Sequence, residues 1–66
     1  MSIEVTPRSQ ATDLYSHRYE VHVKQSEKAG WWMCLGCDDL KTAKSTAAYQ
    51  FTQRGAFAVR IIDNQA

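Results

Sequence analysis

Alternation between apolar and polar side chains predicts three strands in this chain. Residues 18–25, RYEVHVKQ, alternate clearly, and residues 31–36, WWMCLG, are a second β-rich segment after the turn SEKAG. Two such segments joined by about five turn residues are typical of a β-hairpin. Residues 56–63, AFAVRIID, alternate again and predict a third strand.

The segment between the second and third strands changes to helical spacing. Its apolar side chains recur every three or four residues, at Leu40, Ala43, Ala47 and Phe51. This spacing predicts an amphipathic helix with a narrow apolar stripe. The aspartates before Leu40 are suitable N-caps, and Gly55 is placed where a helix commonly ends.

The predicted order is therefore β-β-α-β, an α+β fold in which one helix packs on one face of a three-stranded antiparallel sheet. A right-handed crossover through the helix returns the third strand parallel to the second. The simplest sheet then places the third strand beside the first, in the spatial order 2-1-3, so that all neighbouring strands are antiparallel. Alternation at Ile3 and Val5 can add an N-terminal edge strand. We expect residues 1–17 to form a partly flexible arm, residues 18–63 a single domain, and residues 64–66 a frayed tail.

One helix leaves the second face of the sheet open, and this face is the predicted binding surface. Simple alternation directs these side chains outward: Glu20, His22, Lys24, Trp32, Cys34, Ala58, Arg60 and Ile62. An exposed tryptophan and isoleucine on such a small domain indicate a docking site. The predicted binding residues are Trp32 as the anchor with Arg60, His22, Lys24 and Ile62. A shift of one residue in the second strand would exchange Trp31 for Trp32.

Cys34 and Cys37 form a C-x-x-C motif just before the helix. The order strand, W-x-C-x-x-C, helix resembles the active site of thioredoxin-like oxidoreductases, which implies a reactive thiol at a helix N-terminus. Here Cys34 falls within the predicted strand instead, and two carboxylates follow the motif. A zinc site needs three or four protein ligands, and His17 and His22 are the only histidines that could complete one. We favour the interpretation that both cysteines pack as small apolar residues, without a metal or another cofactor.

Composition narrows the classes of function. Eight Lys and Arg against seven Asp and Glu give a net charge of +1, which argues against a non-specific duplex-DNA binder. Aromatic residues make up 11% of the chain, so weak binding of single-stranded nucleic acid on the sheet surface is an alternative. His22 and Arg60 with Glu20 could form an acid–base set, but without a pocket such residues on a strand are more typical of a solvated face. No phosphate loop is present, and we expect no enzyme activity. No apolar run approaches the ~20 residues of a membrane span, and we expect a cytoplasmic protein.

The leading hypothesis is a small non-enzymatic protein-binding accessory module of the kind common in bacteria, phages and plasmids. It would dock through the open sheet face or a strand edge, on a protein partner or on a second copy as a homodimer. The alternatives are a weak single-stranded nucleic-acid binder and a module held by zinc or acting in redox chemistry through Cys34 and Cys37.

Overall fold

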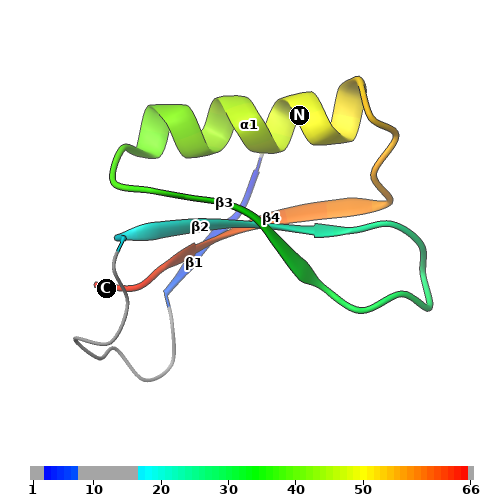
Figure 1. The fold of residues 1–66 in the computed structure, drawn as a ribbon, viewed down its shortest axis with the longest axis horizontal. Coiled ribbons are helices and arrows are strands. Elements are labelled where there is room, and N and C mark those ends of the chain that lie inside the picture. The colour runs from blue at the N-terminus through cyan, green and yellow to red at the C-terminus, as the bar shows by residue number, and fades with distance from the viewer. Residues whose placement is uncertain (1–2, 8–16, 66) are drawn as a thin grey trace.

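The protein has a four-stranded mixed sheet with one helix lying along one face (Figure 1). The computed structural model describes residues 3–7 and 17–65. The elements in chain order are β1 (Val5–Pro7), β2 (Tyr19–Lys24), β3 (Trp32–Cys37), α1 (Leu40–Thr52) and β4 (Ala58–Asp63).

The strands lie in the order β1-β4-β2-β3. β2 is central and antiparallel to both β3 and β4, which is the arrangement expected for the three predicted strands. The sheet is nevertheless four-stranded and mixed, because β1 pairs with β4 in parallel, Val5 beside Ile61. β4 would otherwise leave a row of unpaired backbone groups at the sheet edge, and the Ile61 N–H instead donates to the Glu4 carbonyl at 3.1 Å.

Part of the expected N-terminal arm therefore belongs to the sheet. Residues 1–2 and 8–16 lie outside the described residues, as does residue 66 of the expected tail. Asn64, also assigned to that tail, is only 2% exposed. Its backbone N–H donates to the Arg18 carbonyl at 2.7 Å, so the chain beyond β4 remains attached to the start of β2.

α1 begins and ends with local signals that the sequence carries. The Asp39 carboxylate accepts hydrogen bonds from the Thr42 hydroxyl at 2.8 Å and from the Thr42 N–H at 3.0 Å. These two bonds lower the pKa of Asp39 below its usual value. Gly55 follows the helix with a φ of 70°, a left-handed conformation that favours glycine.

The core lies between α1 and the sheet. Its buried cluster consists of Tyr19, Val21, Ala43, Ala47 and Ile61. The two alanines are the fully buried side chains of α1, and their small size lets the helix lie close to the strands. Phe51, which was expected on the same apolar stripe, is 42% exposed instead.

A β-bulge in β3 changes which side chains face the helix. Val21 pairs with Leu35 but His22 pairs with Met33, so Cys34 is the extra residue. Trp32 consequently pairs with Val23 on the helix side of the sheet, and Met33 lies on the open side. The expectation from simple alternation, with Trp32 and Cys34 outward and Met33 inward, is wrong for this part of the strand.

Candidate functional site

The open face of the sheet carries a chain of hydrogen bonds that runs across β2 and β4. Its members are Asn64, Glu20, His22 and Arg60, and we call them the Glu20 network. Strand alternation places Glu20 and His22 on this face, and the pairing of His22 with Arg60 brings the neighbouring strand beside them. The network therefore follows from strand register.

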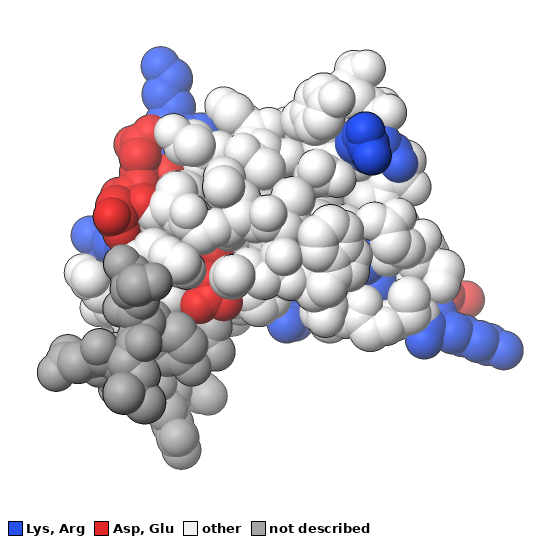
Figure 2. All heavy atoms as spheres, in the orientation of Figure 1, with Lys and Arg blue, Asp and Glu red and all other residues white. Residues whose placement is uncertain are grey.

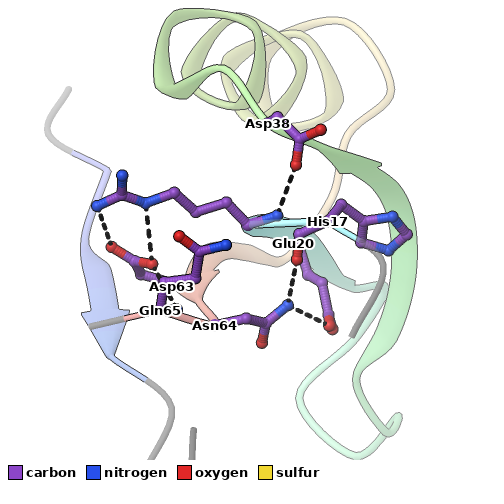
Figure 3. Close-up of polar contacts among 7 residues, drawn as sticks. His17, Glu20, Asp38, Asp63, Asn64 and Gln65 are labelled. Atoms are coloured by element: carbon purple, nitrogen blue, oxygen red, sulfur yellow. Dashed lines mark hydrogen bonds and ion pairs between the residues drawn. The ribbon is translucent and has the colours of Figure 1, made fainter. Parts of the chain in front are cut away.

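Glu20 is the buried centre of the network. Its side chain accepts a hydrogen bond from Asn64 Nδ2 at 2.8 Å, and the same amide also donates to the His17 carbonyl at 3.0 Å (Figure 3). Glu20 and Asn64 are only 6% and 2% exposed. A carboxylate this deeply buried is stable only with such partners.

Polar contacts beside the network fix the ends of β2 and β4. The Arg18 N–H donates to Asp38 Oδ1 at 2.8 Å, and the Arg18 guanidinium lies 3.4 and 3.5 Å from the two oxygens of Asp63 (Figure 3). The Gln65 N–H also donates to Asp63, at 2.9 Å. The Gln65 bond first and the Arg18 contacts second lower the pKa of Asp63 below its usual value.

His22 connects the buried carboxylate to an arginine. Its Nε2 lies 2.9 Å from Glu20 Oε1, and its Nδ1 lies 3.4 and 3.2 Å from Arg60 Nε and Nη2. A guanidinium can only donate, so Nδ1 accepts and the Nε2–H donates to Glu20. Both ring nitrogens are occupied, so the arrangement orients Arg60 and leaves no free ring nitrogen for proton transfer to a substrate.

Trp31, the residue before β3, is the tryptophan associated with this network. The Arg60 guanidinium lies over its ring, 4.2 Å from the centroid, and Lys24 Nζ is 5.9 Å away. Both distances are within the range of cation–π contacts. Trp31 as a residue is 37% exposed.

The structure brings some of the predicted binding residues together and separates others. His22, Lys24 and Arg60 share the open face around Trp31. Trp32 lies on the helix side and is 45% exposed, and Ile62 is on the open side but only 8% exposed.

The sequence analysis placed Glu20 on the open face without assigning it a binding role and named Trp31 only as the alternative to Trp32, and it missed Asn64. The i, i+2 spacing of Glu20 and His22 on a strand was a usable signal, because it places both side chains on one face. Asn64 carried no local signal, since its role depends on contacts with residues more than forty positions earlier.

The four candidate zinc ligands lie on opposite sides of the sheet. Cys34 and Cys37 both pack against the core cluster. The His17 imidazole lies over Gly36 on the open side, where it fills the space that a larger side chain would need, and His22 belongs to the Glu20 network. Within residues 3–7 and 17–65, no three His, Cys, Asp or Glu side chains are placed to hold a metal ion. Both thiols are free, and Cys37 Sγ donates to the Asp39 carbonyl at 3.4 Å.

The start of β3 adds exposed apolar surface next to the network. Trp31, Trp32 and Met33 are consecutive and are 37%, 45% and 50% exposed. β3 lies at the edge of the sheet, and among the described residues no strand pairs with its outer side. Figure 2 shows a broad uncharged surface on the viewed side of the molecule, with most of the visible acidic side chains at one end.

Comparison with protein-family models, curated proteins and solved structures finds no match to this chain. In the part of the chain that the structure describes, no helix has the length and apolar character needed to cross a membrane. Inference about function therefore starts from the geometry of the open face and of β3.

Proposed function

We propose that this protein is a small non-enzymatic binding module that docks on a protein partner through its open sheet face and the start of edge strand β3. The observation that carries the proposal is the run Trp31, Trp32 and Met33, three consecutive large apolar side chains that are all at least 37% exposed. Side chains of this kind dominate the energetics of protein interfaces.

The geometry of this run favours a partner over burial within the chain. Successive side chains of a strand point to opposite faces, so a single neighbouring element of the same chain cannot cover all three. The bulge at Cys34 interrupts the regular edge soon afterwards, which disfavours a long added strand. Docking of a partner's side chains around Trp31 and Met33 on the open face fits both features.

A single-stranded nucleic-acid binder is the second candidate, because Arg60 and Lys24 lie beside an exposed indole. Base-stacking proteins also place cations next to aromatic rings. However, the Arg60 guanidinium already covers one face of the Trp31 ring at 4.2 Å, and the net charge is only +1. Protein binding therefore remains the stronger proposal.

The test compares Trp31→Ala with Tyr49→Ala in the purified full chain. Tyr49 is the matched control because it is a large aromatic residue, 52% exposed, on α1 rather than near the open face. We expect affinity-tagged Trp31→Ala to lose the partner that the wild type captures, by roughly 30-fold or more in affinity. Tyr49→Ala should keep the partner, and circular dichroism should show both variants folded.

Two further measurements test homodimerisation and nucleic-acid binding as alternatives to a different protein partner. Sedimentation velocity over a range of concentrations detects a homodimer, in which case the partner is a second copy and Trp31→Ala should be monomeric. Quenching of tryptophan fluorescence by a short oligonucleotide at low salt, lost as salt rises, would support nucleic-acid binding instead. Equal partner capture by Trp31→Ala and the wild type would overturn the proposed docking surface.

A further inference from the structure

We propose that the open face recognises an acidic segment of the partner, and that Arg60 holds one carboxylate of that segment beside Trp31 with Lys24 as the second cation. This inference rests on the proposed protein-binding function and specifies the chemistry of the partner. Its basis is the unused hydrogen-bonding capacity of an arginine that the Glu20 network holds in place.

Arg60 uses only one edge of its guanidinium within the protein. Nε and Nη2 point to His22 Nδ1, at 3.4 and 3.2 Å. The opposite edge, formed by Nη1 and Nη2, retains donors in the parallel arrangement that matches a carboxylate. In the described part of the chain, neither Arg60 nor Lys24 has a carboxylate within ion-pair distance.

The Glu20 network orients this arginine before any partner arrives. Asn64 and His22 hold Glu20, His22 in turn accepts from Arg60, and the guanidinium lies over the Trp31 ring, 4.2 Å from its centroid. Long arginine side chains normally lose rotamer freedom when they bind a ligand. An arginine that is already fixed loses less, so the binding free energy of a carboxylate is more favourable.

Charge complementarity favours a partner segment that is negatively charged. Glu20 is the acidic residue of the network, and at 6% exposed its charge is buried with its hydrogen-bond donors. The cations of Lys24 and Arg60 lie against the Trp31 ring, with Lys24 Nζ 5.9 Å and the Arg60 guanidinium carbon 4.2 Å from its centroid. A docking segment that carries Asp or Glu next to an apolar side chain would pair with these cations and pack on Trp31 and Met33.

A peptide fits this surface better than a nucleic-acid strand. Stacking of a base needs an open ring face, and the guanidinium occupies one face of Trp31. The exposed Met33 on the same face adds an apolar surface that suits a peptide side chain.

The test is titration of the 15N-labelled full chain with a ten-residue peptide that contains glutamate and phenylalanine, monitored by NMR. We expect saturable shifts of the Arg60 Nε–H and Trp31 Nε1–H signals. The same peptide with glutamine in place of every glutamate should bind at least tenfold more weakly. Arg60→Lys keeps the positive charge but lacks the two parallel N–H donors of the guanidinium, and it should also bind the peptide about tenfold more weakly. Arg54→Lys, at an exposed position after α1, is the matched control and should bind like the wild type.

Three outcomes would overturn the inference: equal binding of the glutamate and glutamine peptides, wild-type affinity in Arg60→Lys, or tighter binding of a ten-nucleotide oligothymidine than of the acidic peptide. Failure of the proposed function has a different signature. If Trp31→Ala loses the natural partner while Arg60→Lys keeps it, protein docking stands and the acidic partner does not. If neither variant changes capture, both proposals fail.

Discussion

Replacing Glu20 with alanine should destabilise this protein strongly, although Glu20 lies on the face of the sheet that α1 does not cover. The carboxylate accepts from Asn64 Nδ2 at 2.8 Å and contacts His22 Nε2 at 2.9 Å. Truncation leaves both donors without this acceptor. Asn64 is 2% exposed and cannot regain a water molecule without local opening, whereas the His22 side chain is 14% exposed and can do so in part.

The size of the effect follows from the cost of unpaired buried donors. One such group costs roughly 1–3 kcal/mol, so full loss at Asn64 and partial loss at His22 amount to about 2–4 kcal/mol. A chain of 66 residues has a free energy of unfolding of roughly 3–10 kcal/mol at ~0.05–0.15 kcal/mol per residue. Glu20→Ala should therefore remove at least about a fifth of the total stability.

Urea denaturation followed by tryptophan fluorescence and far-UV circular dichroism measures this loss. Glu27→Ala is the matched control, because Glu27 is an exposed glutamate in the turn between β2 and β3, where substitutions usually change stability by less than about 0.5 kcal/mol. Glu20→Gln keeps one acceptor and should fall between the wild type and Glu20→Ala. If Glu20→Ala and Glu27→Ala unfold at the same urea concentration, the network does not stabilise the open face and our reasoning fails.

Three further predictions concern the turn, the core and the acid response. Gly55→Ala should cost about 1 kcal/mol in thermal unfolding because of its φ of 70°, whereas Gly30→Ala should have little effect, since an added Cβ there meets open space; equal melting temperatures would contradict this. Ile61→Ala should cost about 3–4 kcal/mol in urea unfolding because Ile61 is fully buried, with Ile61→Val near 1 kcal/mol, and a smaller loss would show that the core collapses around the cavity. The pKa of Asp63 is lowered in the folded state, so its contribution to stability is present above the usual value of 3.8 and is lost as pH falls through the folded pKa. Unfolding free energies measured from pH 6 to pH 2 should therefore fall less steeply for Asp63→Asn, and identical slopes would refute the assignment.

Local patterns were sufficient for the main elements and their order. The alternation in β2 and β4 and the three- and four-residue spacing in α1 are properties of consecutive residues. Asp39 and Gly55 act on the backbone beside them, so the ends of the helix could also be predicted from the sequence. The parallel pairing of β1 with β4 could not be predicted from the sequence, because β1 has three residues, one of them Pro7, and these are too few to establish a period.

Which side chains lie on the open face depends on contacts between segments that are distant in the sequence. The bulge at Cys34 exists only in the pairing of β3 with β2, and it moves Trp32 to the helix side and Met33 to the open side. Asn64 is near the end of the chain, yet it holds Glu20 across 44 positions.

Side-chain periodicity was thus enough to predict where the strands and the helix form, and the presence of one helix was enough to predict that α1 covers only one face of the sheet. Tertiary contacts bring Trp31 and Arg60 together on the other face, where the buried Glu20 carboxylate holds His22 and His22 holds Arg60. Strand register and long-range hydrogen bonds produce that arrangement, and neither is encoded in the spacing of neighbouring residues.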